Sequence, residues 1–75
     1  MRVTVKLIGP LIYKAGFSEK KVALPAAATV GDLLSRIKVP RRRPKIVTRN
    51  GKVAGPDEAL KDGDRVAVSP IYSGG

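Results

Sequence analysis

The two ends of the chain carry the same alternation of apolar and polar residues, and this pattern constrains the fold more than any other feature. The apolar positions are Val3, Val5 and Leu7 in the first segment and Val66 and Val68 in the second. Alternation with a period of two indicates a strand that buries one face. Residues 2–8 and 65–69 are therefore predicted to be strands that share one core.

One amphipathic helix is predicted between these two strands. Its apolar residues recur at i, i+3, i+4 and i+7, and they are Val30, Leu33, Leu34 and Ile37. Such spacing places them on one stripe of a helix. Thr29 and Asp32 have the spacing of a capping box, and Pro40 is expected to end the helix because the residue before a proline avoids the helical region.

Turn signals divide the rest of the chain into short elements. Residues 19–24 read as a second strand that ends at a proline, and residues 45–53 read as a hairpin around Asn50-Gly51. Asn-Gly between apolar runs is the strongest short hairpin signal, because both turn positions need a positive φ. We expect residues 57–60 to form one short helical turn.

Two further segments have more than one interpretation. Residues 11–17 are predicted to be a hairpin connection, with Tyr13 and Phe17 packed against the domain rather than forming a ligand platform. Asp62 and Asp64 flank a glycine, which suggests either a tight turn or part of a metal or acid–base site. The turn is favoured, because no other carboxylate cluster completes a site.

The order of these elements predicts an α+β fold. A single helix covers only one face of a sheet, so we expect a mixed sheet of four to five strands with the helix packed across one face. The first and last strands should lie side by side and parallel in the centre, which is the ubiquitin-like β-grasp arrangement. The predicted core consists of Val3, Val5, Leu7, Val22, Leu24, Val30, Leu33, Leu34, Ile37, Ile46, Leu60, Val66 and Val68. Residues 1–70 are predicted to form the domain, and residues 71–75 a flexible tail.

Composition excludes several kinds of site. The chain has 75 residues, with no cysteine and no histidine, so thiol catalysis, iron–sulfur clusters and zinc sites are not expected. No apolar run approaches the roughly 20 residues of a membrane span, and no signal peptide is recognisable, so we expect a cytoplasmic protein without a membrane anchor. The formal net charge of +9 predicts attraction to polyanions or to an acidic partner surface.

The last 17 residues, ALKDGDRVAVSPIYSGG, resemble the ending of ThiS- and MoaD-type sulfur carriers. That ending combines a leucine, an Asp-Gly-Asp turn, a valine-rich strand and a terminal Gly-Gly. Residues 28–37, ATVGDLLSRI, are similar to the start of the helix in this family, and residues 50–53, NGKV, stand where the family has its hairpin. The resemblance covers most of the chain in the right order.

The resemblance implies a carrier that is a substrate of other enzymes and not an enzyme itself. A ubiquitin-activating-type enzyme would use ATP to adenylate the carboxylate of Gly75. A sulfur donor, such as a cysteine desulfurase or a rhodanese, would then convert this group to a thiocarboxylate. The carrier would pass the sulfur to a synthase of molybdopterin or thiamine biosynthesis, or to a tRNA thiolase. It is expected to bind no cofactor and to be a monomer when free.

The same resemblance assigns roles along the tail. Ile71, Tyr72, Ser73 and Gly74 would thread into the active site of the activating enzyme. Glycine lacks a Cβ, which suits a chain end that enters a narrow slot. The strong positive charge departs from the near-neutral or acidic charge common in the family, and it implies an activating enzyme with a more acidic docking face.

Two alternative functions remain open at this point. The chain could be a ubiquitin-like modifier that is conjugated to lysines through the same activated tail. It could also be a small basic nucleic-acid-binding module, for which Arg41, Arg42, Arg43 and Lys45 are the candidate contacts with phosphates or with an acidic protein surface. A solvated loop is the slightly favoured interpretation of this basic run. No pair of aromatic residues stands beside it for base stacking.

Overall fold

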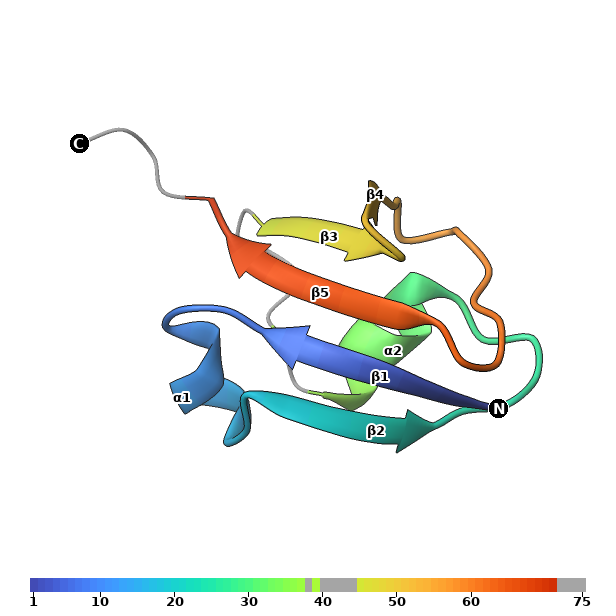
Figure 1. The fold of residues 1–75 in the computed structure, drawn as a ribbon, viewed down its shortest axis with the longest axis horizontal. Coiled ribbons are helices and arrows are strands. Elements are labelled where there is room, and N and C mark those ends of the chain that lie inside the picture. The colour runs from blue at the N-terminus through green and yellow to red at the C-terminus, as the bar shows by residue number, and fades with distance from the viewer. Residues whose placement is uncertain (38, 40–44, 72–75) are drawn as a thin grey trace.

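The computed structural model describes residues 1–37, 39 and 45–71, which form one five-stranded sheet with two helices. The elements in chain order are β1 (Arg2–Leu7), α1 (Leu11–Ala15), β2 (Glu19–Ala23), α2 (Val30–Arg36), β3 (Lys45–Arg49), β4 (Lys52–Val53) and β5 (Arg65–Pro70). The strand order is β2-β1-β5-β3-β4 (Figure 1). This is the mixed sheet that the sequence predicts.

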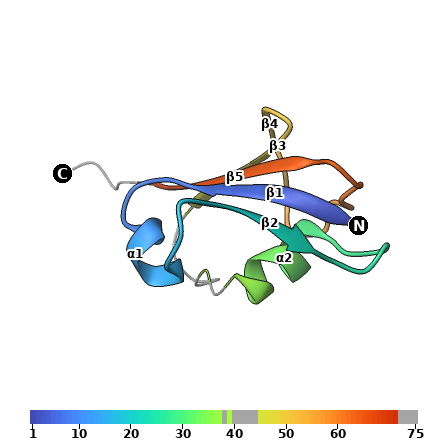
Figure 2. The same cartoon turned by 60° about the horizontal axis from the view of Figure 1, so that its bottom comes forward.

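The first and last strands of the domain form the parallel centre of the sheet. Val5 lies opposite Val66 and Leu7 opposite Val68, while every other strand pair is antiparallel. α2 lies on one side of the sheet, within the connection between the two central strands (Figure 2). Because β1 and β5 run in the same direction, Met1 and Ile71 lie at opposite ends of the molecule (Figure 1).

α2 begins with the predicted capping box. The backbone N–H of Asp32 donates to Thr29 Oγ1 over 3.3 Å, and the backbone N–H of Thr29 donates to Asp32 Oδ2 over 2.9 Å. These bonds satisfy donors that the first turn of a helix leaves unpaired. The helix ends at Arg36, and Pro40, its predicted stop, lies outside the described residues.

The core lies between the sheet and α2 and contains most of the predicted residues. The buried apolar residues are Val3, Val5, Leu7, Leu11, Leu24, Ala28, Val30, Leu33, Leu34, Ile37, Val39, Val47, Ala54, Leu60, Val66 and Val68. Val22 is only partly buried. Ile46 was predicted to be buried, and this is wrong, because it is 43% exposed. Val47 points inward instead, since its position in β3 lies opposite the buried Val68 of β5.

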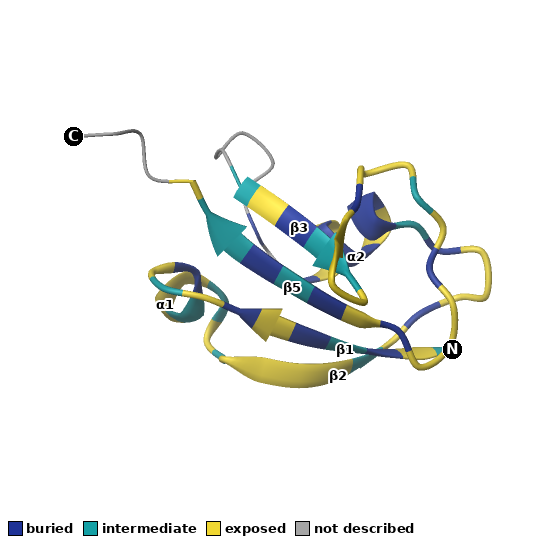
Figure 3. Ribbon diagram, turned by 45° about the horizontal axis from the view of Figure 1, so that its top comes forward, coloured by how far each residue is buried: buried dark blue, intermediate teal, exposed yellow. Residues whose placement is uncertain are grey.

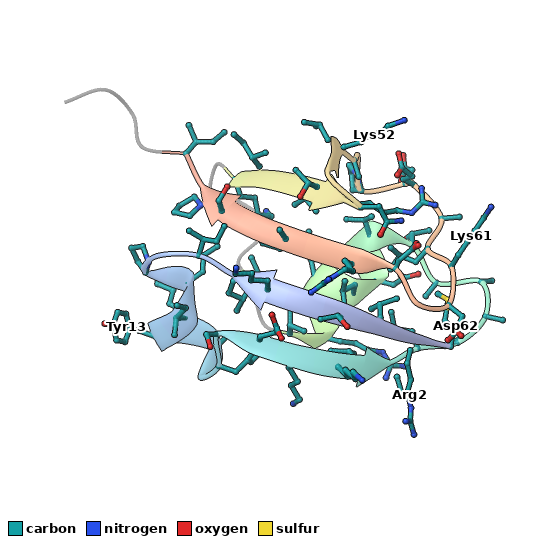
Figure 4. All side chains as sticks on the ribbon, viewed as in Figure 1. Arg2, Tyr13, Lys52, Lys61 and Asp62 are labelled. Carbon is teal, nitrogen blue, oxygen red and sulfur yellow. The ribbon has the colours of Figure 1, made fainter. Side chains whose placement is uncertain are left out.

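The segment expected to be a hairpin connection contains the short helix α1. The N–H of Gly16, which has a φ of +86°, donates to the carbonyl of Ile12 over 2.8 Å and closes the helix. Leu11 is buried in the core and Phe17 packs against it, as expected. Tyr13 does not pack on the domain, because it points away from α1 and is 89% exposed (Figure 4).

The Asn50-Gly51 hairpin is confirmed, whereas the helical turn expected at residues 57–60 is absent. Asn50 and Gly51 both have positive φ values, 52° and 87°, as a tight hairpin turn requires. The backbone near Ala59 instead forms a bridge to Thr29, and the N–H of Leu60 donates to the carbonyl of Ala28 over 3.0 Å. These bonds tie this segment to the start of α2 and compete with a local helix.

Asp62, Gly63 and Asp64 form the predicted turn, and Asp64 has a structural role. Its buried carboxylate accepts hydrogen bonds from Arg49 Nε over 2.7 Å, from Asn50 Nδ2 over 2.9 Å and from the backbone N–H of Lys61 over 2.8 Å. Burial opposes ionisation of the carboxyl group, but these hydrogen bonds outweigh it and lower the pKa of Asp64 to about 2. Arg49 also pairs with Glu58 over 2.9 Å.

Candidate functional site

The candidate site is the point where the chain leaves the central strand β5. Val68 is the last fully buried residue of this strand, Pro70 ends the strand, and Ile71 follows with 48% of its surface exposed. The remaining predicted site residues of the tail, Tyr72, Ser73, Gly74 and Gly75, lie outside the described residues. The predictions made for them therefore stay predictions.

Of the predicted basic contacts, only Lys45 belongs to the described part of the chain. It is the first residue of β3, is half-buried, and lies opposite Pro70 in the β3–β5 pairing. The structure therefore brings Lys45 next to the base of the tail, although 25 positions separate these two residues in the sequence. Arg41, Arg42 and Arg43 lie outside the described residues.

Three exposed isoleucines gather where β5 ends. Ile46 lies opposite Ser69 on β5, and the N–H of Ile8 donates to the carbonyl of Val68 over 3.0 Å, which brings Ile8 to the other side of the same strand. Ile8 is 44% exposed and Ile46 is 43% exposed, and Ile71 continues from the strand between them. We call Ile8, Ile46 and Ile71 the isoleucine cluster. These side chains are the exposed apolar groups nearest the chain exit, and we treat them as a candidate contact for a partner.

Sequence reasoning predicted a role for Ile71 but missed the other two members of the cluster. The sequence did contain evidence that Ile8 is exposed. Side chains alternate between the two faces of a strand, and Ile8 directly follows the buried Leu7, so it should point to the opposite, solvent-facing side. Ile46 and Val47 are adjacent and both apolar, so the pattern alone could not say which of them points outward. The pairing with β5 decides this.

The strand positions that face away from α2 carry an excess of positive charge. The charged ones among them are Arg2, Lys6, Lys21, Arg65 and Glu19, which gives four cations and one carboxylate. Lys6 and Glu19 lie opposite each other on β1 and β2. We call this side of the sheet the open face. Lys6 lies on the same half of this face as the isoleucine cluster, whereas Arg2 and Arg65 lie at its other end, where β1 and β5 begin. A partner surface with an apolar centre and a carboxylate facing Lys6 would complement it.

No group of three or more carboxylates among residues 1–37, 39 and 45–71 is arranged to hold a metal ion. The ion pairs in these ranges join Arg49 to Asp64 and Glu58, in the network that ties the aspartate turn to β3. Neither helix of this part of the chain is long and apolar enough to cross a membrane.

The fold and the exposed chain exit define a ubiquitin-like β-grasp protein, and solved structures of this class match it over nearly the whole chain. SAMP1 from Haloferax volcanii is 30% identical, with a TM-score of 0.82 and full coverage of both chains. The putative molybdopterin converting factor subunit 1 from Pyrococcus furiosus is also 30% identical, with a TM-score of 0.83, and 96% of this chain matches 99% of that one. A chain in the BexX/CysO complex of Amycolatopsis orientalis is 29% identical, with a TM-score of 0.65, and 97% of this chain matches 99% of it.

The family follows from the sequence as well. The model of the ThiS family matches residues 5–75, and the chain therefore belongs to the ThiS family. The family resemblance found in the C-terminal block and the predicted β-grasp fold are both confirmed. The similar chain from Amycolatopsis orientalis was solved in a complex of two proteins, BexX and CysO.

Proposed function

We propose that this protein is a sulfur carrier whose C-terminal glycine carboxylate, at Gly75, is adenylated by a ubiquitin-activating-type enzyme and converted to a thiocarboxylate. The observation that carries the proposal is the exit of the chain from β5, beside the exposed isoleucine cluster and beyond the last buried residue, Val68. Membership of the ThiS family and the likeness to a putative molybdopterin converting factor subunit support the same role. We place the reaction in the cytoplasm.

The chemistry needs a chain end and a partner but no catalytic side chain from the carrier. A carboxylate is a poor electrophile, and attack of its oxygen on the α-phosphate of ATP converts it to an acyl-adenylate with release of pyrophosphate. Hydrosulfide adds to the acyl carbon and displaces AMP to leave the thiocarboxylate. A persulfide donor instead gives an acyl disulfide, and a thiol reductant must then cleave its S–S bond to release the thiocarboxylate. The tail must reach into the active site of the activating enzyme for both steps, while the folded domain docks outside it.

The domain would contribute a rigid base for the tail and a docking surface. β5 is held by hydrogen-bonded strands on both sides, so Pro70 and Ile71 start the tail from a fixed point. The isoleucine cluster would pack against the activating enzyme, and the cations of the open face would attract acidic residues around the contact. Interface residues of this kind contribute most when they are desolvated at the centre of a contact.

The direct test is the intact mass of the protein purified from its native host, with and without the activating enzyme. We expect a fraction of the carrier to be heavier by the mass difference between sulfur and oxygen, and this fraction to vanish when the activating enzyme is deleted. The proposal fails if no adenylating enzyme of the host charges the full-length protein in the presence of ATP and a sulfur source. It also fails if the native polypeptide continues past residue 75 and is never trimmed.

The isoleucine cluster gives a second test. Ile46→Glu is expected to raise the KM of the activating enzyme for the carrier by about 10-fold, because a carboxylate would replace a central apolar contact and meet an acidic partner surface. The change should leave the free energy of unfolding within about 0.5 kcal/mol, since Ile46 is exposed. Initial rates of carrier-dependent pyrophosphate release give the KM.

Val53→Glu is the matched control for this substitution. Val53 is 77% exposed and lies on the edge strand β4, away from the chain exit. The same change of charge and size there should alter the KM less than about 2-fold. Equal effects at the two positions would show that net charge, and not the isoleucine cluster, governs docking.

A second candidate function is conjugation to other proteins. Two similar solved structures from Haloferax volcanii are those of SAMP1 and of the small archaeal modifier protein 1. Both functions would use the same activated tail, so they can coexist. Conjugation predicts slow-migrating adducts in the host that carry an isopeptide bond between Gly75 and a lysine of the target, which peptide mass spectrometry identifies.

A further inference from the structure

A groove runs along the free edge of β2, on the side of the sheet that carries α2 and opposite to the open face. It has a volume of about 400 Å³. Most of its exposed lining is polar, and its apolar part, which we call the floor, consists of Phe17, Val22 and Ile37, which belong to or pack against the core. Its rim is formed by Lys20 and Arg36, and Lys21 also lines it although its side chain belongs to the open face. We call this feature the β2 groove.

The backbone of β2 beside this groove has an unpaired edge. Leu24 and Met1 exchange both backbone hydrogen bonds, and Leu7 donates to the carbonyl of Ser18, so the even-numbered residues of β2 bond to β1. In an antiparallel pair the intervening residues direct their N–H and C=O groups outward. Lys21 and Ala23 therefore present donors and acceptors at the edge of the sheet, where β2 is exposed almost throughout (Figure 3). Such an edge can accept a further strand.

The charge on the rim selects the occupant. Among the described residues that line the groove, every charged one is a cation. Lys20 stands over the ring of Phe17, with its Nζ 5.6 Å from the ring centroid, so positive charge lies directly beside the apolar floor. Two copies paired antiparallel about Lys21 would set this residue against its counterpart, and like charges on neighbouring strands repel. Two copies paired about Lys20 would set Lys21 against Glu19, so a second copy is a rival occupant that the test below separates from a peptide.

We propose that the β2 groove binds an extended, acidic peptide segment of a partner protein, which adds to β2 as a sixth strand. Because side chains alternate along a strand, every second residue of the peptide faces the groove. An apolar residue beside Val22 would cover the floor, and a carboxylate two positions away would lie beside Lys20 and Arg36. The backbone of Lys21 and Ala23 would supply the strand hydrogen bonds. This site is separate from the chain exit, so a carrier could be held by such a segment while its tail is engaged.

The probe is a seven-residue peptide with blocked ends, Val-Thr-Val-Thr-Glu-Thr-Glu, titrated into the ¹⁵N-labelled full-length protein. Its Val and Glu residues share one face, and threonine favours the strand conformation on the other. We expect the largest amide shifts at Phe17, Lys21, Ala23 and Ile37, and slower hydrogen exchange at Lys21 and Ala23. A peptide with Lys in place of Glu should not bind. A peptide with Pro at its third and fourth positions should not bind either, because proline lacks the donor that a strand needs.

Charge reversal on the rim tests the electrostatic part of the proposal. The double variant Lys20→Glu/Arg36→Glu should weaken binding of the acidic peptide by about 10-fold or more. The matched control is Lys52→Glu/Lys61→Glu, which changes the net charge equally at exposed positions far from β2 (Figure 4). It should change the affinity less than about 2-fold. If the double variant fails to fold, Lys20→Gln/Arg36→Gln carries the same test with smaller effect.

Several results would overturn the proposal. Shifts at Ile8 and Ile46 instead of the β2 groove would assign the peptide to the open face. If the basic peptide binds as tightly as the acidic one, or if the rim variant binds the acidic peptide as tightly as the wild type, positive charge on the rim does not select the peptide. Concentration-dependent shifts along β2 without peptide would mean that a second copy occupies the edge, and displacement of the peptide by single-stranded RNA at the same residues would assign the rim to nucleic acid. The assay contains no activating enzyme, so its outcome is independent of the carrier function.

Discussion

Deleting Gly75 is expected to abolish thiocarboxylate formation completely while leaving the domain folded. The carboxylate of the shortened chain would belong to Gly74 and would lie one residue, about 3.5 Å of extended chain, short of the reacting position. Misplacement of this size removes the near-attack geometry on which acyl transfer depends. Intact mass after incubation with the activating enzyme, ATP and a sulfur source measures the result.

The fold should tolerate this deletion because the core ends well before the tail. Val68 is the last buried core residue, and β5 ends at Pro70. The midpoint of urea unfolding should therefore match that of the full-length protein. A variant with one alanine added after Gly75 keeps every native residue and should be charged as poorly as the deletion. Charging of either variant at the normal rate would mean that the tail does not act through its terminal carboxylate.

Asp64→Asn is expected to cost about 2 kcal/mol or more of the free energy of unfolding at pH 7. The pKa of Asp64 is lowered from 3.8 to about 2 in the folded protein, so the folded state favours the ionised carboxylate. The amide would also direct N–H groups toward Arg49, Asn50 or the backbone N–H of Lys61, which are themselves donors. Urea unfolding followed by circular dichroism measures the loss.

The pH dependence of this effect has a definite sign. Because the folded pKa is depressed, the stabilisation from Asp64 is complete above the unfolded pKa near 4 and is lost as the pH falls through about 2. The difference in stability between wild type and Asp64→Asn should therefore shrink over this window. Asp57→Asn, the same change at an exposed aspartate, should cost less than about 0.5 kcal/mol at pH 7. A difference that persists unchanged to pH 2 would show that ionisation of Asp64 is not its source.

Sequence reasoning predicted the architecture because the strongest patterns lie in the elements that define it. The alternation in β1 and β5 sets which side chains are buried, and the capping box at Thr29 marks the start of α2. The predictions were wrong in segments where the hydrophobic pattern of the sequence is weak. Ile46 and Val47 are adjacent and both apolar, so the alternation of apolar and polar residues does not show which of them faces the core. Only the pairing of β3 with β5 decides this. The five residues of α1 are too few for a helical period to be visible.

The surroundings of the chain exit were harder to predict than the tail itself. The terminal block is contiguous in the sequence, so its resemblance to a family could be read directly. The isoleucine cluster and the position of Lys45 beside Pro70 depend on strands that meet only in the folded sheet. The Asp64 network has the same origin, since Arg49 and Asn50 lie 15 and 14 positions from Asp64. Rules based on the spacing of residues along the chain cannot predict contacts between segments that meet only in the folded protein.

The parallel central strands also determine how the molecule can be handled. Met1 lies at the opposite end from Ile71, so a resin, a fluorophore or a fused reporter attached to the amino terminus would stand far from the point where the chain leaves β5 (Figure 1). The ammonium group of Met1 donates to the carbonyl of Leu24 over 2.8 Å, and the amide N–H that replaces it in a fusion can still donate there. A bead coated through this end would present every copy in the same orientation, with the isoleucine cluster directed away from the bead.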